Sequence, residues 1–440
     1  MVMRSRIRWA VRHGLVRRAV RRGMRAGDLG SRLMLDPAIR EDPYPCYDQL
    51  RAQGRIVRSG IALISAHHDV CQAVLRSPDF GQIQPDRLPV PLRVAMRFGG
   101  RPVLGPIEPP SMLVVDPPEH TRYRKLVTRA FSARAVAALR TRVEAVAEEL
   151  LDELTDSNAG SAPVDLVARY ASLLPATVIA EMLGAPVAMR RQFLDWGAGG
   201  SLSLDIGLTY RDFRRSEHDL AALHRWMLGH FEQVRRALRN DIPPKNILSS
   251  LVTAHDEGGQ LSTDELSSIA MLLLAAGFET TVNLLGNGTV LLLRQPDQLA
   301  RLRARPLGWA NAVEEILRYD SPVQRTGRVA LRDTEVVGRR IPAGAFIILL
   351  LGGANRDPAV FPDPDLFDVQ RPEARENLSF SSGIHYCIGA ALARVEGEVG
   401  LRALFTRFPD LALAGAPHRR PTRVLRGYDT IPVTLSNSHK

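Results

Sequence analysis

The sequence predicts a mostly α-helical fold with a minor β component, and two observations carry this prediction. Apolar residues recur at helical spacing through most of residues 119–319, whereas β-prone runs occur in two short places, 55–65 and 327–358. The composition agrees with a globular enzyme, because 45% of the 440 residues are hydrophobic and 24% are charged.

The first third of the chain predicts short elements and one long loop. A short helix follows the proline-rich entry at residue 36, a Ser-Gly turn at 55–65 predicts a hairpin, and residues 67–77 predict a helix. Residues 78–118 are rich in proline and glycine, and a loop of that length is usually functional or disordered. Helices are then expected at 119–131, 133–154, 165–184, 188–197 and 211–239.

The longest helix is predicted from Ser262 to Arg294. Ser262 and Glu265 form the S-x-x-E pattern of a capping box at its start. Its middle, IAMLLLAAGF, is apolar on all sides, so the helix must lie inside the protein. Helices at 295–304 and 308–319 and a small antiparallel sheet at 327–358 are expected to follow.

The positive charge is concentrated at the start of the chain. Residues 1–27 contain nine arginines and no acid, and the remainder has 49 basic and 47 acidic residues. A nucleic-acid-binding protein carries its charge on the folded surface, so this distribution argues against that class. Arg18 and Arg22 interrupt the apolar stripe of Ile7, Val11 and Leu15, so we expect a disordered tail whose contact with a membrane surface would be mostly electrostatic.

The chain is expected to comprise an arginine-rich extension (1–35), one catalytic domain (36–435) and a short C-terminal tail (436–440). No run of about 18 apolar residues predicts a transmembrane helix. Three distant cysteines suit the cytoplasm, and Cys46 and Cys71 are expected to be ordinary buried residues.

Cys387, in FSSGIHYCIGA, has a different setting. Gly383 and Gly389 allow tight turns beside it, and a helix begins directly after it, which together favour a thiolate. A hydrolase would need a base that we cannot identify, and zinc would need three or four ligands where His385 alone is close. A single thiolate fits haem iron best.

Two further patterns are ambiguous when taken alone. In AAGFETT, Gly277 and Glu279 interrupt an apolar helix, which indicates either a kink or a groove where a ligand sits and protons are delivered. Glu315 and Arg318 lie three residues apart, as in an ordinary surface ion pair.

These motifs together resemble the cytochrome P-450 superfamily. FSSGIHYCIG matches all five fixed positions of the haem-thiolate signature F-x-x-G-x-H-x-C-x-G. AAGFETT looks like the family's dioxygen-activating motif, Glu315 and Arg318 match its E-x-x-R, and Arg371 looks like the third member of that network. DPPEHTRYRKLV and GRVALRDTEVVGRRIPAG resemble the bacterial soluble branch, and the resemblance covers residues 36–435.

The resemblance implies a helix-rich domain around haem b (iron protoporphyrin IX), with small antiparallel sheets. Cys387 would be the axial ligand of the iron, and Thr280 with Glu279 would relay protons to dioxygen. Glu315, Arg318 and Arg371 would form a buried structural network. The residues that would contact the haem, four of them at its propionates, are His120, Arg124, Arg328 and His385, then Phe380, Gly383, Gly389, Ala276 and Gly277.

The chain departs from the family pattern at two positions. Ser381 stands where the family often has glycine, and Asn377 stands where it often has histidine. Either residue could alter the hydrogen bonding near the thiolate.

The expected reaction is a monooxygenation of a hydrophobic substrate such as a lipid, steroid, terpenoid or polyketide. No dinucleotide fingerprint is present, so a ferredoxin and its NAD(P)H-dependent reductase would supply the electrons. The alternatives are a haem-thiolate peroxygenase or isomerase, or a haem-binding sensor. The substrate pocket is expected between residues 80–115, 196–210, 272–281 and 321–327, with lining residues Leu88, Val90, Met96, Leu104, Leu202, Leu204, Leu273 and Ala276.

Overall fold

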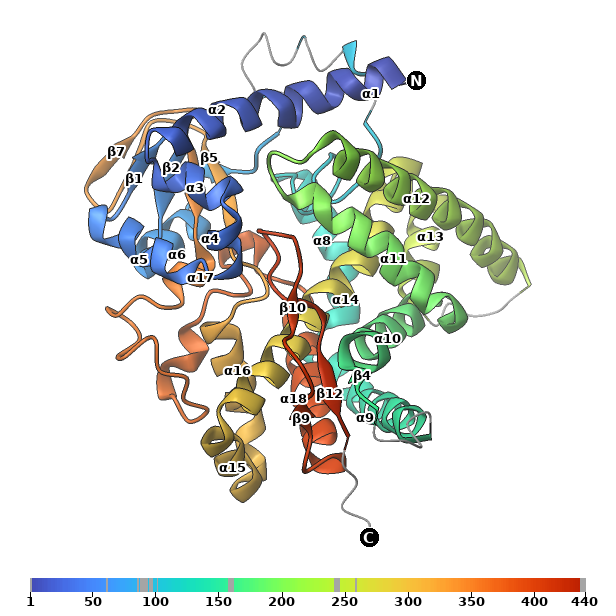
Figure 1. Cartoon of the computed structure of the whole chain (residues 1–440). Helices are drawn as coiled ribbons and strands as arrows, with labels where there is room; N and C mark the ends of the chain where they lie inside the picture. Colours follow the sequence, from blue (N-terminus) through green and yellow to red (C-terminus); the bar gives the residue numbers. More distant parts are fainter. Residues whose placement is uncertain are drawn as a thin grey trace.

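Helices make up most of the chain and surround one long buried helix. The computed structural model describes residues 2–60, 62–84, 87, 94, 98–100, 102–156, 162–240, 246–257 and 259–435. Figure 1 shows helices grouped around α14 (Thr263–Arg294), with a lobe containing the largest sheet on one side. The prediction of a mostly α fold with minor β is confirmed.

The N-terminal segment is helical, so the expectation of a disordered tail is wrong. α1 (Val2–Trp9), a π-helical turn (Ala10–Gly14) and α2 (Leu15–Arg25) form a rod across the outside of the molecule (Figure 1). His13 and Val20 on its inner face are buried. The segment is ordered by partners on distant parts of the chain, which an inspection of its own residues could not reveal.

The sheet lobe joins the N-terminal part of the chain with residues 326–354. The predicted hairpin is confirmed, because β1 (Val57–Ser59) pairs antiparallel with β2 (Ala62–Ser65). The later strands were expected to form a separate antiparallel sheet, but one mixed sheet has the order β1-β2-β8-β5-β3 and β2 pairs parallel with β8 (Phe346–Leu349). The remaining elements of this lobe are α3 (Leu29–Leu35), α4 (Pro37–Glu41), α5 (Tyr44–Gln53), α6 (His68–Arg76), β3 (Phe80–Gly81), β5 (Thr326–Ala330), β6 (Thr334–Val336), β7 (Arg339–Ile341) and α17 (Leu351–Ala354).

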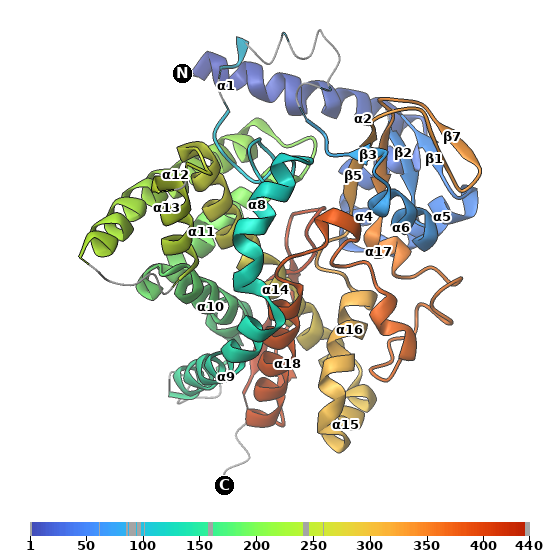
Figure 2. The ribbon, with the colours of Figure 1, turned by 180° about the vertical axis from the view of Figure 1, so that it is seen from behind.

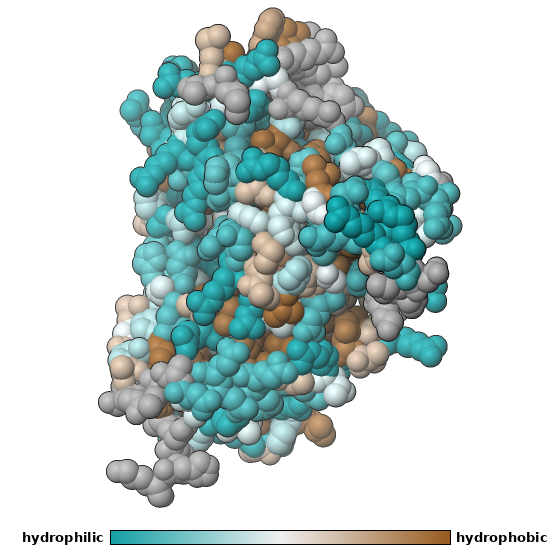
Figure 3. Space-filling model, turned by 90° about the vertical axis from the view of Figure 1, so that its right-hand side faces the viewer, coloured by the Kyte–Doolittle hydropathy of each residue, from teal (hydrophilic) through white to brown (hydrophobic). Residues whose placement is uncertain are grey.

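The helical part follows the predicted order with one addition, α13 (Ile247–Asp256), which the sequence analysis missed. The predicted helices are α8 (Glu119–Thr128), α9 (Ala133–Asp156), α10 (Leu173–Leu183), α11 (Arg190–Ser201), α12 (Tyr210–Arg239), α15 (Pro296–Ala304), α16 (Trp309–Tyr319) and α18 (Ala390–Arg407). The remaining short strands are β4 (Val164–Asp165), β9 (Ala412–Leu413), β10 (His418–Arg419), β11 (Tyr428–Thr430) and β12 (Pro432–Thr434). Figure 2 shows α8 crossing over the far side of the molecule, and Figure 3 shows mostly hydrophilic side chains on the side of α12 and α13.

α14 is the core of the helical part. Its capping box is confirmed, since the Glu265 N–H donates to Ser262 Oγ and the Ser262 N–H donates to the Glu265 carboxylate over 2.7 Å. The helix is long and apolar enough to cross a membrane, but 72% of its most apolar stretch is buried inside the protein. That burial is what the all-round apolar pattern requires of a core helix.

Candidate active site

The loop before α18 presents Cys387. A 3₁₀ turn (Gly383–His385) precedes the cysteine, and α18 begins at Ala390, as predicted. Gly383 has φ +68°, and a Cβ there would collide with the carbonyl oxygen of Leu75, so the position requires glycine. Gly389 has φ −85°, which any residue can adopt, so the turn itself does not require glycine there.

The thiol of Cys387 lies deep in the protein although its own surface is exposed. Burial raises its pKa, and the N–H of Gly389 and the charges of Arg124 and Arg394 oppose that rise without overcoming it. The expectation that the glycine turns and the helix start together favour the thiolate is therefore wrong for the protein groups by themselves. A bound metal ion deprotonates a coordinating thiol outright, so ligation would reverse this balance.

A cluster of cationic and imidazole side chains lies in the same region. His120 and Arg124 are four residues apart on α8, and the rings of His120 and His385 are 4.3 Å apart. Arg124 donates to the carbonyl oxygen of Tyr386 over 2.7 Å, which ties α8 to the Cys387 loop. Arg328 on β5 is 4% exposed and donates to Thr326 and to a backbone carbonyl, with no carboxylate in ion-pair contact among the described residues.

Asp116 acts on His120 and Arg328 through its charge, but its carboxylate is ion-paired with Arg87. Burial and the neighbouring cations Arg328, His120 and Arg124 lower the pKa of His385 to about 3, and burial lowers the pKa of His120. Burial also lowers the pKa of Arg328 to about 10. The buried Nε2 atom of His385 has no hydrogen-bond partner. A bound group with two carboxylates beside a single sulfur ligand would satisfy this cluster, and haem has that form. The residues present therefore fit haem.

The middle of α14 has exposed surface within a buried helix. Ala276 is exposed and Thr280 is half-buried, whereas Phe278 and Glu279 are buried. The Thr280 hydroxyl donates to the Ala276 carbonyl oxygen over 3.3 Å, and such a threonine back-bond can stabilise the kink considered above as an alternative. A Cβ on Gly277 would lie 2.7 Å from Cγ1 of Ile179, so this glycine permits close packing against α10.

Glu279 forms an ion pair with Arg420, a residue that the sequence analysis missed. Arg420 also donates to the carbonyl oxygen of Tyr428 over 3.1 Å. The pair compensates the cost of burying a carboxylate. Its partners are 141 residues apart, and no motif around Arg420 could have indicated it.

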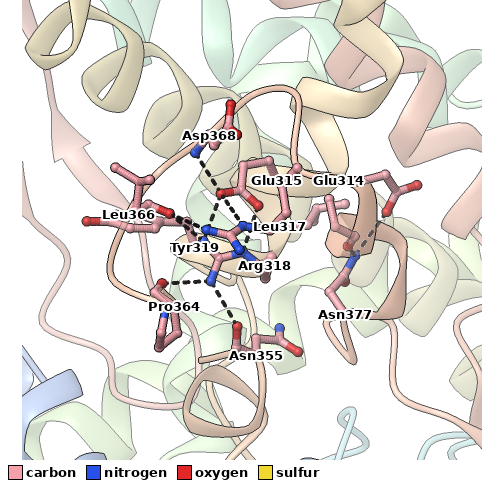
Figure 4. Close-up of polar contacts among 12 residues, drawn as sticks. Glu314, Glu315, Leu317, Arg318, Tyr319, Asn355, Pro364, Leu366, Asp368 and Asn377 are labelled. Carbon is pink, nitrogen blue, oxygen red and sulfur yellow. Dashed lines mark hydrogen bonds and ion pairs between the residues drawn. The ribbon is translucent and has the colours of Figure 1, made fainter. Parts of the chain in front are cut away.

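Glu315, Arg318 and Arg371 form a buried network, so the surface-pair alternative is wrong. Figure 4 shows Glu315 and Arg318 with their partners. Glu315 and Arg318 are both 0% exposed, and the guanidinium donates to the carboxylate over 2.6 and 2.7 Å. Arg371 lies 3.3 Å from the same carboxylate. Further donors and acceptors complete the network: the N–H of Asp368 and the carbonyl oxygens of Asn355, Pro364 and Leu366. The network thus fixes α16 to the segment that leads into the Cys387 loop.

The two departures from the family pattern have different structural consequences. Ser381 has φ +64°, a conformation that favours glycine, and its buried hydroxyl has no partner. Asn377 donates to Glu314 over 3.0 Å and to the carbonyl oxygen of Ala374 over 2.8 Å. Its contacts are therefore with α16 and the preceding turn.

Phe380 lies beside the cysteine, since its carbonyl oxygen accepts a hydrogen bond from the N–H of Cys387 over 3.0 Å. The guanidinium of Arg394 lies 4.5 Å from the centre of its ring. Among the expected pocket residues, Leu104, Leu202 and Leu204 are half-buried and Leu273 is buried. Leu88, Val90 and Met96 lie outside the described residues.

Glu396 on α18 is a second residue that the sequence analysis missed. It is 1% exposed, and neither carboxylate oxygen has a hydrogen bond of ordinary geometry. Burial raises its pKa to about 8, and nearby Thr281 opposes that rise. A lone acid on the apolar face of the helix after Cys387 was the available signal.

Comparison with known proteins identifies the family. The cytochrome P450 family model matches residues 104–304 and 310–417, so the chain belongs to this family. It is 48% identical over 437 residues to the putative cytochrome P450 140 of Mycobacterium tuberculosis, covering 98% of each chain. It is 45% identical over 329 residues to the 6-deoxyerythronolide B hydroxylase of Saccharopolyspora erythraea, covering 74% of this chain and 78% of that protein.

The fold also matches solved structures. A myxobacterial cytochrome P450, CYP267B1, in complex with myristic acid has a TM-score of 0.82 at 33% identity, covering 92% of this chain and 99% of that one. Family membership and the hydroxylase relative support the class of enzyme predicted above, a cytochrome P450 monooxygenase with haem as its cofactor.

Replacing Arg318 with alanine should destabilise the protein by about 3–5 kcal/mol, because the Glu315 carboxylate would remain buried beside a weaker partner. Urea denaturation would measure the loss. Arg407→Ala is the control, since Arg407 forms exposed pairs with Glu148 and Asp152 and should cost at most about 1 kcal/mol. Equal losses in the two variants would contradict the structural role.

Ser381→Gly should stabilise the protein by up to about 1 kcal/mol, because it removes a strained backbone conformation and an unpartnered buried hydroxyl. Thermal unfolding would detect the rise in midpoint. Ser382→Gly is the matched control, because Ser382 has φ −152° and accepts a hydrogen bond from Arg76 over 2.9 Å. That variant should be less stable than the parent, and a loss at both positions would refute the assignment of strain to Ser381.

Glu396 should make the protein less stable as pH rises. Between its unfolded pKa near 4.5 and its folded pKa of about 8, the folded state retains a proton that the unfolded state has lost. The free energy of unfolding therefore falls across this window. Measured by chemical denaturation, the stability of Glu396→Gln relative to the parent should increase between pH 5 and pH 8. Glu398→Gln, which removes a partner of Arg140 on the same helix, should show no such growing gain.

Proposed function

We propose that the protein inserts one oxygen atom from dioxygen into a hydrophobic substrate, with haem b held by Cys387. The observation that supports this most is the pairing of one interior thiol with a cationic cluster that lacks carboxylate partners among the described residues. When bound, the haem iron supplies reductive activation of dioxygen.

The chain's own residues then divide the work. Cys387 would supply the sulfur ligand, and His120, Arg124, Arg328 and His385 would hold the propionates. Phe380 and Gly389 beside the cysteine and Ala276 with Gly277 on α14 would line the haem site, and Gly383 allows the turn before the cysteine. These assignments follow the signature motif and agree with the exposed surface of Ala276 and Cys387.

Thr280 is proposed to hold a water molecule for proton delivery, with Glu279 as the acid behind it. Thr280 has exposed surface where α14 is otherwise buried, and its hydroxyl can exchange the back-bond to Ala276 for a water. The ion pair with Arg420 keeps the Glu279 carboxylate in place beneath it. A proton that Glu279 delivers to Thr280 must therefore come from a carboxylate that is ion-paired with Arg420.

The substrate class is proposed from the apolar lining and from the relatives. Leu104 lies in the loop before α8, and Leu202 and Leu204 lie in the turn between α11 and α12. Their half-buried apolar side chains favour a lipid, steroid, terpenoid or polyketide. One relative is named for hydroxylating 6-deoxyerythronolide B, and a structural neighbour was solved with myristic acid.

Electrons are proposed to come from a ferredoxin and its NAD(P)H-dependent reductase, in the cytoplasm. Around the Cys387 loop, Ile384 is 50% exposed and Tyr386 is 40% exposed. Arg76, Arg124 and Arg394 all bond to this loop. An apolar centre with a basic rim suits an acidic ferredoxin. A membrane contact is also proposed for the exposed arginines of the N-terminal helices, of which Arg18, Arg21, Arg22 and Arg25 lie on one face.

The absorption spectrum of the dithionite-reduced protein under carbon monoxide tests this function. A far red-shifted Soret band in the parent, lost in Cys387→Ser, would support thiolate ligation. A band at the shorter, histidine-type position in the parent would overturn it.

Thr280→Ala should still bind substrate but divert electrons to hydrogen peroxide, because the proton relay would lack its hydroxyl. Product formed per NAD(P)H should fall by about tenfold or more. Thr289→Ala is the control, since Thr289 makes the same back-bond, to Leu285, more than two turns further along α14. An unchanged yield in Thr280→Ala would rule out this role.

A further inference from the structure

We propose that the N-terminal helices α1 and α2 clamp together the two loops that border the substrate entrance, and that Arg8 and Arg12 control how readily it opens. The inference rests on the proposed function, because it assumes that substrate passes between these loops to reach α14. The first loop lies before α8, and its described residues are 99, 100 and 102–108. The second is residues 202–217, which lead into and begin α12.

α1 and the following turn hold the first loop through two arginines. Arg8 donates to the carbonyl oxygen of Gly99, and Arg12 donates to both carboxylate oxygens of Glu108. Glu108 is 4% exposed, so this bidentate pair is largely shielded from water. The first loop is therefore bonded to the N-terminal helices at Gly99 and at Glu108.

The same helices hold the second loop. Arg8 and Ser5 both donate to the Glu217 carboxylate, over 2.6 and 2.7 Å. Trp9 donates to the carbonyl oxygen of Leu208 over 2.9 Å, and Arg17 donates to that of Gly207 over 2.7 Å. Arg8 is thus a bridge, since its guanidinium contacts both loops at once.

Apolar contacts support the clamp. The rings of Trp9 and Tyr210 are 5.7 Å apart, and those of His13 and Phe213 are 5.4 Å apart. His13 is buried, and its Nδ1 accepts a hydrogen bond from the N–H of Leu208 over 3.4 Å. These contacts hold the rod in one orientation, so the arginine side chains lose less conformational entropy when they bind their partners.

The clamped elements lie over the proposed active site. A small cavity of about 40 Å³ is bounded by all three parts, including Arg12, Gly105, Ser203 and Leu220. Leu220 packs against Gly105 and Gly200, and Gly197 of α11 packs on the ring of Phe278 of α14. On this proposal, a substrate that passes between the two loops on its way to Thr280 separates elements that the N-terminal rod holds together. Figure 1 shows the rod lying across the outside of the molecule.

The other arginines on the rod provide a matched control. Arg18 and Arg21 are exposed and have no ion pair among the described residues. The variant Arg18→Ala/Arg21→Ala removes the same charge as Arg8→Ala/Arg12→Ala but leaves every clamp contact intact. A purely electrostatic effect of the rod would appear in both variants.

Two measurements test the clamp. Hydrogen exchange of the full chain should show about tenfold loss of protection at residues 99–108 and 202–217 in Arg8→Ala/Arg12→Ala. In stopped-flow experiments on the haem-loaded protein, a bulky aryl-imidazole should associate several-fold faster in this variant. Imidazole itself, which is small, should associate at the parent's rate. The control variant Arg18→Ala/Arg21→Ala should match the parent in hydrogen exchange and in the association rates of both azoles.

Two further variants guard against simple misfolding. Arg12→Gln with Glu108→Gln leaves no buried charge unpaired, and Arg8→Glu with Glu217→Arg reverses one ion pair. The first should open the entrance. The second should restore parental exchange at residues 202–217 only, because a carboxylate at position 8 re-forms the ion pair with position 217 but cannot donate to the Gly99 carbonyl oxygen. If exchange rises in residues 2–25 while both loops and the azole rates stay unchanged, the clamp is refuted. Absence of any azole spectral change in the parent would refute the haem assignment, and the exchange data would still decide the clamp.

Discussion

The Arg318 guanidinium is the group on which the rest of the site depends. A buried cation is tolerated only when its charge and its N–H groups are satisfied, and Arg318 achieves this with one carboxylate and three backbone carbonyl oxygens. Those carbonyls belong to a segment with little regular structure that leads into the Cys387 loop. The position of the sulfur therefore depends on α16 as well as on the hydrogen bonds of the loop itself and of Arg124.

The site itself is electrostatically incomplete as a set of protein groups. Burial disfavours the thiolate of Cys387, and the cluster around Arg328 holds positive charge with little to offset it. Both imbalances are resolved by the same kind of ligand, a metal-centred group with two carboxylates. The side chains of the site leave positive charge without a carboxylate partner and a thiol without a metal, and haem supplies both missing groups.

Arginine–carboxylate pairs appear in three settings with different consequences. In the Arg318 network the pair is fully buried and fixes a loop, and at Glu279 it holds an acid beneath the proposed proton relay. At the N-terminal rod Glu108 is shielded from water, but the side chains of Arg8 and Arg12 keep 16% and 21% of their surface exposed. Water can therefore reach the arginine side of each pair, which suits a clamp that must break and re-form when a substrate enters.

The sequence by itself determined the helices, the cysteine and the family. Helix periodicity and the S-x-x-E capping box are local, so α14 and most helices after residue 119 were predictable, and the signature motif is contiguous around Cys387. Tertiary structure decided the parallel pairing of β2 with β8, the partner of Glu279, the burial of Glu396 and the order of residues 2–25. The physical reason is common to all four. Each depends on contacts between residues far apart along the chain, and a local pattern carries no information about which distant carboxylate, strand or helix face will meet it.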